Sequence, residues 1–188
     1  MSNGIKVKKR NGRGTEALNL EKMHKMVDEA TQGLAGVSAS QVEIQSGIQF
    51  YDGITTAEIQ EILIKSASDL IDLEHPNYQF VAARLLLFSV RKSLYGRSRE
   101  LPELEDHIVK CVAQEVYDGD IYSKYSKEDI EKANGYIDHN RDFLFTYAGL
   151  RQVVDKYLVQ DRSTGAVSYT HLRAHETLRY LVCRLLLE

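Results

Sequence analysis

Several features are scarce or missing in this 188-residue sequence, and each absence excludes a class of protein. The two cysteines, Cys111 and Cys183, form no Cys-x-x-Cys pair, so a zinc ribbon is excluded and a disulfide framework has no basis. Only two prolines, Pro76 and Pro102, interrupt the chain, which favours helices. There is no run of about 18 apolar residues and no signal peptide, so we expect neither membrane insertion nor secretion, and a cytoplasmic location.

Charge and length narrow the choice further. The formal net charge of −3 and a pI near 6.1 lack the basic excess of a general nucleic-acid binder. The hydrophobic content of 43% suffices for a core, and 188 residues can hold one domain, or a small domain with part of another. We therefore look for local rather than global charge as the guide to a ligand.

Positive charge gathers near the start of the chain. Lys8, Lys9 and Arg10 precede Asn11-Gly12, a dipeptide typical of a two-residue β-hairpin turn because both residues tolerate positive φ. These cations could simply solvate an edge strand, or they could be presented to an anion. The two segments that we expect to pair across the turn are 5–10 and 15–18.

A helix start follows the hairpin. Asn19 is suited to cap it, and the free N–H groups of the first turn, which also holds Lys22, then form a place where negative charge is stabilised. Four cations, a turn and a capped helix suit a nucleoside triphosphate. No Gly-rich run ends in Gly-Lys-Ser or Gly-Lys-Thr, so the sequence favours nucleotide binding over hydrolysis at a P-loop.

Four helices are predicted in the first half of the chain from apolar residues at helical spacing. The third begins with a capping box, Thr55 to Glu58, and carries an apolar stripe from Ile59 to Ile71; the fourth is apolar nearly all round and is expected at the centre of the bundle. The expected helices run from Asn19 to about Gly33, from Ser40 to about Phe50, from Thr55 to His75-Pro76, and from Asn77 to Lys92.

A polar, basic stretch at 97–103, interrupted by Pro102, suggests a domain boundary. Beyond it the pattern is again helical, with predicted helices at 104–112, 126–137 and 143–159. The polar run 138–142 could form a metal or acid–base site, but it falls between helices, where such residues usually cap helix ends and pair charges. We favour the structural role for this run.

Separated motifs resemble one known family. Segments 7–12 (VKKRNG), 19–22 (NLEK), 48–54 (IQFYDGI) and 82–85 (AARL) resemble the ATP-cone of a ribonucleotide reductase. Segments 136–142 (YIDHNRD) and 156–160 (KYLVQ) resemble the opening of the catalytic barrel in the aerobic class I large subunit. The resemblance covers about residues 5–165 and implies a mainly α fold. The expected ATP-cone, at 1–96, is a four-helix bundle capped by a small β-hairpin or sheet. It is followed at 97–167 by a helical segment of a truncated reductase catalytic domain.

The resemblance also implies which residues bind the nucleotide. Lys9, Arg10, Lys22 and Lys92 are expected at the phosphates, and Glu16 and Asn19 at the ribose or nearby polar groups. The pocket is completed by Thr56 and by the backbone of Ala17, Leu18, Asn19, Leu20 and Glu21. Two positions depart from the family pattern: Gln60 stands where relatives can carry histidine, and Arg13-Gly14 lengthens the hairpin turn.

In that family the cone is an allosteric domain that binds ATP as activator or dATP as inhibitor. Mg²⁺ is expected to accompany either nucleotide. ATP and dATP differ by one hydroxyl group, and coupling free energies between sites of about 1–3 kcal/mol can convert such a difference into another subunit arrangement. The implied partners are the small radical-generating subunit and a second copy of the full large subunit. Neither nucleic acid nor membrane is an expected partner.

The resemblance implies no catalysis by this chain alone. Reduction in the family needs a radical cysteine, a reducing cysteine pair and polar partners within the barrel, and none of these is recognised in this sequence. We therefore expect a fragment without catalytic residues, cofactor or metal site, in which Cys111 is a packing residue.

The last segment, 168–188, resembles translated sequencing-adaptor read-through and is expected to be an artefact. His171 and His175 within it have i,i+4 spacing, which can bind a metal on a helix, but the usual acidic third ligand is missing. Two alternatives to the reductase remain: a helical interaction module whose hairpin meets acidic partners, and a cone-bearing transcriptional repressor. The repressors place a four-cysteine zinc ribbon before the cone, and this sequence has none.

Overall fold

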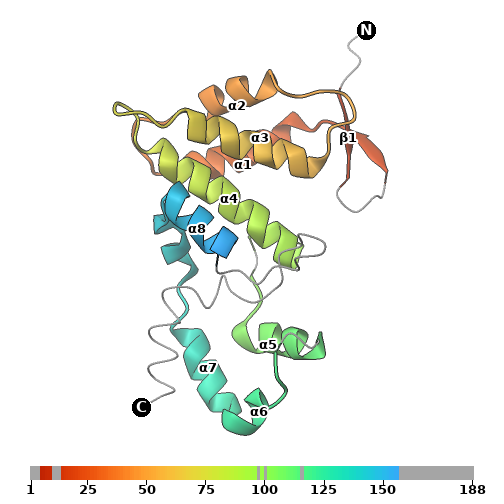
Figure 1. Ribbon diagram of the computed structural model, residues 1–188, viewed down its shortest axis with the longest axis vertical. Coiled ribbons are helices and arrows are strands. Elements are labelled where there is room, and N and C mark those ends of the chain that lie inside the picture. Colours follow the sequence, from red (N-terminus) through yellow and green to blue (C-terminus); the bar gives the residue numbers. More distant parts are fainter. Residues whose placement is uncertain (1–4, 10–13, 97, 100, 115–116, 157–188) are drawn as a thin grey trace. The chain divides into compact units, whose positions relative to one another are not determined.

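The computed structural model describes residues 5–9, 14–96, 98–99, 101–114 and 117–156 (Figure 1). Within these ranges the chain is mostly helical, with one small two-stranded sheet, which confirms the expected mainly α fold. It forms two compact units. The first comprises residues 1–89 and 143–151, and the second comprises residues 90–142 and 152–188. The limits 1–96, 97–167 and 168–188 stay predictions, and the segment 168–188 lies outside the described residues.

The predicted hairpin is present. Strand β1 (Lys6–Lys8) pairs antiparallel with strand β2 (Thr15–Ala17), and Val7 lies directly opposite Glu16. Val7 is only 3% exposed while its strand neighbours are exposed, because successive side chains of a strand point to opposite faces. The predicted turn Asn11-Gly12 lies outside the described residues.

The other edge of β1 is also paired, which the sequence did not indicate. The backbone N–H of Lys6 donates to Asp52 Oδ1 (2.8 Å), and Gly53 N–H donates to the Lys6 carbonyl (2.8 Å). Next along the strand, Lys8 N–H donates to the carbonyl of Ile54 at 2.9 Å. Segment 52–55, predicted only as a turn and a helix cap, therefore also fastens the hairpin to the bundle.

Three helices follow in the first unit, α1 (Leu20–Thr31), α2 (Ala39–Gly47) and α3 (Thr56–Asp69). Each begins with a side-chain cap, supplied in turn by Asn19, Ser38 and Thr55. The predicted start of the second helix at Ser40 was wrong by one position, because Ser38 rather than Ser40 accepts the capping hydrogen bond, from Gln41 N–H. In Figure 1 the β1–β2 hairpin lies at one end of α1 and α3.

The third helix ends earlier than predicted. It stops at Asp69 rather than near His75, and Ile71 is 39% exposed instead of belonging to the buried stripe. Asp72 starts a turn of its own here, because its Oδ1 accepts the backbone N–H of His75 at 2.5 Å. Side chains buried along α3 include Ile59, Leu63, Ile64 and Ala67.

Helix α4 (Tyr78–Tyr95) is the buried centre that its composition predicted. Val81, Ala82 and Leu87 are fully buried. In the first unit, Arg84 donates from Nη1 to the carbonyls of Ala30 (3.1 Å) and Gln32 (2.8 Å), so it holds the end of α1 against α4. Helix α1 ends at Thr31, which confirms the predicted end of the first helix near Gly33.

Beyond α4 the chain continues in short helices. They are α5 (Leu104–Ala113), α6 (Ile121–Lys124), α7 (Lys127–Gly135), the 3-10 helix η1 (His139–Leu144) and α8 (Tyr147–Lys156). The sequence predicted α5 and α7 but not α6. The helix predicted from Phe143 begins only at Tyr147, because the Thr146 carbonyl and hydroxyl accept the first hydrogen bonds of α8, and its predicted end at Val159 lies outside the described residues. None of the helices in the described ranges is long and apolar enough to cross a bilayer.

Candidate functional site

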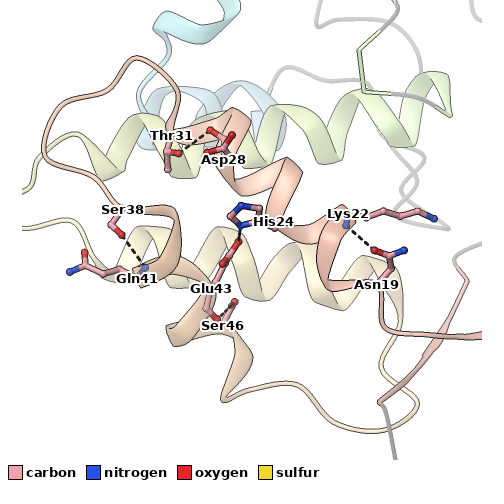
Figure 2. Close-up of polar contacts among 9 residues, drawn as sticks. All are labelled: Asn19, Lys22, His24, Asp28, Thr31, Ser38, Gln41, Glu43 and Ser46. Carbon is pink, nitrogen blue, oxygen red and sulfur yellow. Dashed lines mark hydrogen bonds and ion pairs between the residues drawn. The ribbon is translucent and has the colours of Figure 1, made fainter.

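The first turn of α1 has the geometry that the sequence predicted. Asn19 is extended (φ −96°, ψ 95°), and its Oδ1 accepts the backbone N–H of Lys22 at 2.9 Å. Figure 2 shows the Asn19 side chain turned back over this turn. Lys22 itself is exposed, and Glu21 is the acidic residue of the turn. The start of α1 therefore presents backbone N–H groups beside a solvent-accessible ammonium group.

The hairpin leads directly into this helix start. Ala17 ends β2, and the backbone N–H of Leu18 donates to the carbonyl of Ile5 at 2.8 Å, so the sheet pairing continues to one residue before the cap. Leu20, the first residue of α1, is 60% exposed. The stretch 17–21, expected to run along the nucleotide, is thus an ordered and accessible segment between the sheet and the helix.

Lys9 and Glu16 form an ion pair across the hairpin. Lys9 Nζ lies 2.9 Å from Glu16 Oε2, and the two side chains are 46% and 41% exposed. Lys9 is two positions after the buried Val7 and Glu16 is opposite Val7, so both belong to the face of the hairpin that covers the core. The sequence placed these residues in one site but did not predict that they pair with each other.

Lys8 occupies the opposite face. Its position in β1 alternates with Val7, and its charge helps to lower the pKa of Glu58. The larger causes of that lowered pKa are hydrogen bonds from the Thr55 backbone N–H (2.8 Å) and hydroxyl (2.7 Å), followed by one from the Tyr51 hydroxyl (2.9 Å). Lys8 therefore belongs with the cap of α3 and not with Lys9, although the sequence grouped the two lysines.

The start of α3 is the third segment of the site. Thr55 pairs with Lys8 as an isolated parallel bridge, and Thr56 follows it as the first residue of the helix, half-buried. The reciprocal bond from Glu58 N–H to Thr55 Oγ1 (3.1 Å) completes the predicted capping box. Backbone hydrogen bonds to β1 thus bring the starts of α1 and α3 to the same small sheet.

Three other predicted positions have different outcomes. Arg10 lies outside the described residues. Lys92 is exposed in the last turn of α4 and belongs to the second unit. Gln60 is buried (5% exposed), and its Nε2 lies 3.8 Å from Met26 Sδ, so it packs between α3 and α1.

The sheet pairing of residues 52–54 is the feature that sequence reasoning missed. The available signal was the position of Gly53, which has φ 85° and lies between a turn and a capping box. A side chain there would be strained, and a Cβ would lie 3.9 Å from Lys8 Cε. The left-handed backbone, and not a lack of space for a side chain, is what requires glycine at this position.

The polar run 138–142 has the structural role that we favoured. In the second unit, Asp142 Oδ2 accepts from Arg91 Nη2 at 2.6 Å and lies 3.5 Å from His139 Nδ1. Asp138 Oδ1 accepts the backbone N–H of Asn140 at 2.9 Å. Among the described residues, no group of three or more His, Cys, Asp or Glu side chains is placed to hold a metal ion.

Cys111 packs as expected. It is fully buried in α5, with its Sγ 3.6 Å from His107 Nε2, and burial raises the pKa of the thiol. A thiol with a raised pKa forms little thiolate at neutral pH and is a poor nucleophile. Cys183 lies outside the described residues.

Comparison with known proteins finds similarity to one type of domain and to one type of enzyme subunit. Residues 5–93 match the model of the ATP cone domain. The chain is 47% identical over 167 residues to ribonucleoside-diphosphate reductase 1 subunit alpha of Escherichia coli K12, covering 89% of this chain and 22% of that protein. It is 40% identical to the subunit alpha of enterobacteria phage T4 (87% and 22% covered) and 39% identical to that of Helicobacter pylori (87% and 20% covered). The chain spans about a fifth of the length of these relatives.

Proposed function

We propose that this chain binds ATP or dATP as an allosteric regulator of ribonucleoside-diphosphate reduction. Its residues 5–93 match the ATP cone domain, and the chain is homologous to the amino-terminal region of reductase alpha subunits. ATP acts as activator and dATP as inhibitor in this proposal. The regulated activity, which supplies deoxyribonucleotides, belongs to the whole reductase. The chain contributes the nucleotide sensor.

The observation that carries the proposal is the meeting of three anion-suited elements at one sheet. Lys9 projects from the hairpin, Lys22 lies in the capped first turn of α1, and Thr56 starts α3, whose preceding residue pairs with β1. Helix starts and ammonium groups both favour a polyanion. We assign the phosphates to Lys9, Arg10, Lys22 and Lys92, and the remaining polar contacts to Glu16, Asn19, Thr56 and the backbone of 17–21.

Mg²⁺ enters with the nucleotide in this proposal. The described residues offer no acidic cluster for a metal of their own, and Mg²⁺ commonly binds through phosphate oxygens and water with few protein ligands. The proposed partners are the small radical-generating subunit and a second copy of the large subunit, in the cytoplasm.

Calorimetry on the full chain tests the proposal. We expect ATP and dATP to bind with nanomolar to micromolar dissociation constants. Lys9→Ala and Lys22→Ala should each weaken binding roughly ten- to hundredfold, because each removes a charge-assisted contact to phosphate worth about 1.5–3 kcal/mol. Lys25→Ala is the matched control, since Lys25 is an exposed lysine of α1 beyond the first turn, and its loss should leave the affinity nearly unchanged.

Two results would contradict the proposal. One is the lack of binding at millimolar nucleotide, which would favour a helical interaction module. The other is an equal loss of affinity in all three lysine variants, which would show that only net charge matters and that no defined phosphate site exists.

A further inference from the structure

The end of α1 that lies away from Lys22 is held by a side chain of another helix. The last turn of α1 contains no basic residue of its own. Arg84 of α4 supplies a cation there, because its Nη1 donates to the carbonyls of Ala30 (3.1 Å) and Gln32 (2.8 Å), and Gln32 caps the helix. A helix end has carbonyls without intrahelical donors and carries partial negative charge, so a guanidinium group stabilises it.

The same guanidinium group lies over an aromatic ring from a distant part of the sequence. Arg84 Cζ is 5.5 Å from the centre of the Phe143 ring, and Phe143 belongs to η1. Burial lowers the pKa of Arg84, and no acceptor among the described residues reaches its buried Nε. A partly desolvated cation gains more from a ring face than an exposed one does. The positions of Arg84 and Phe143 therefore depend on each other.

Phe143 begins a segment that returns to the first unit. Residues 143–151, which we call the return segment, belong to the same compact unit as α1, whereas the residues on either side of them belong to the second unit. The Phe143 ring meets the buried Phe88 edge-on, with 6.2 Å between ring centres, and Leu150 is fully buried. The return segment is thus part of the unit that holds the start of α1.

The order of α1 and the docking of the return segment should depend on each other. Helix α1 has 12 residues, and a helix of this length forms and frays cooperatively. A polyanion bound at its first turn therefore also favours order in its last turn. When the last turn frays, Arg84 loses its two carbonyl acceptors, and Phe143 loses the fixed guanidinium group beneath its ring.

We infer that Arg84 couples the order of α1 to the docking of the return segment, so that a nucleotide bound at the start of α1 stabilises residues 143–151. The inference rests on the proposed function, because it takes the start of α1 as a phosphate site. Arg84 is a positioning residue here and does not contact the nucleotide. The coupling requires only that nucleotide binding and segment docking both favour the ordered state of α1.

Hydrogen–deuterium exchange on the full chain, with and without saturating ATP, tests the coupling. The Leu150 amide reports on the return segment, because it donates to the Thr146 carbonyl at 2.9 Å. The Lys22 amide reports on the first turn of α1. We expect ATP to slow exchange at both, and at Leu150 by about 2- to 30-fold, the range that corresponds to a cation–π contact. The amides of α7, in the second unit, are the reference and should change less.

Two variants break the contact from opposite sides. Phe143→Leu keeps an apolar side chain against Phe88 but removes the ring face. Arg84→Lys keeps the charge but removes the planar group that reaches two carbonyls and the ring. In both, the effect of ATP at Leu150 should fall to that of α7, while its effect at Lys22 remains. Leu144→Ala is the matched control, since Leu144 is the neighbour of Phe143 in η1, is 72% exposed and should retain the full effect.

The two proposals fail differently. If calorimetry detects no ATP binding and exchange at Lys22 is not slowed, the proposed function itself is wrong. If ATP slows exchange at Lys22 but not at Leu150, the nucleotide site stands and only the coupling is wrong. The coupling is also overturned if α7 is slowed as much as Leu150, or if Phe143→Leu and Arg84→Lys keep the full effect at Leu150. Circular dichroism verifies that each variant retains its helices.

Discussion

Helices α3 and α7 begin with the same local motif in two different settings. At α3, Thr55 and Glu58 cap each other, and at α7, Ser126 and Asp129 do the same, with backbone-to-side-chain distances between 2.8 and 3.2 Å. In both, hydrogen bonds from the capping residue lower the pKa of the acid. The two capping boxes therefore make the same local hydrogen bonds and have the same effect on the pKa of their acid.

The surroundings of the two capping boxes differ. Thr55 also pairs with Lys8 of β1, and Glu58 accepts a hydrogen bond from Tyr51. Helix α7 is linked to α5 at both ends: Lys127 Nζ lies 3.2 Å from Glu105 Oε1 in an exposed ion pair, and Asn134 Oδ1 accepts the backbone N–H of Leu104 at 2.9 Å. Backbone pairing with a strand thus distinguishes the start of α3 from the start of α7, which an exposed ion pair links to α5. This comparison yields four predictions.

The largest effect is expected at the residue that joins β1 to α3. Ile54 is fully buried and its carbonyl accepts from Lys8 N–H, so Ile54→Ala should lower the free energy of unfolding by about 2–5 kcal/mol and weaken ATP binding. Ile130 of α7 is 6% exposed, and Ile130→Ala should destabilise the protein while leaving ATP affinity unchanged. Urea unfolding and calorimetry measure both. Equal effects of the two variants on ATP binding would refute the comparison.

The caps themselves come next. Thr55→Ala should cost about 1–2 kcal/mol of unfolding free energy and Ser126→Ala about 0.5–1 kcal/mol, because both lose a cap but only Thr55 belongs to a helix start paired with the sheet. Only Thr55→Ala should also reduce ATP affinity. Thr55→Ser keeps the hydroxyl and serves as the control, with stability expected to stay near that of the wild type.

The acids predict the pH dependence. The pKa of Glu58 is lowered by folding, so its contribution to stability is present above its ordinary value of 4.5 and is lost as the pH falls through the lower folded-state pKa. The stability difference between wild type and Glu58→Gln should therefore shrink as the pH falls. Asp129→Asn should show the same trend, since the pKa of Asp129 is lowered too. Thermal unfolding measured from neutral pH down through the folded-state pKa values checks this. An increase towards low pH in the stability difference between wild type and either variant would disprove the prediction.

The smallest effect is expected at Tyr51. Its hydrogen bond to Glu58 raises the pKa of the phenol above the ordinary 10.0, and Glu58→Gln should bring that pKa back down because the charged acceptor is gone. Tyrosine ring signals in nuclear magnetic resonance can follow this titration. Asp129→Asn provides the reference, since it should leave the pKa of Tyr51 where it is.

Local features of this fold could be predicted from the sequence because they depend on neighbouring residues. Asn19 caps α1, Thr55 and Glu58 form their capping box, and the apolar α4 is buried, all as the pattern indicated. The errors arose where distant or competing groups decide. Helix α3 ends earlier than predicted because Asp72 caps a turn of its own. Lys8 lies apart from Lys9, with which the sequence grouped it, because strand alternation directs it towards the cap of α3.

By itself, the sequence determined the helices, the hairpin and the types of residue that suit an anion, since periodicity, caps and turn residues act over a few positions. The tertiary structure alone decided that segment 52–55 fastens β1 to α3 and that Lys9 pairs with Glu16 rather than standing free. These contacts depend on strand register and on which face each side chain takes. A shift of one residue reverses every face in a strand, so local composition cannot specify these contacts.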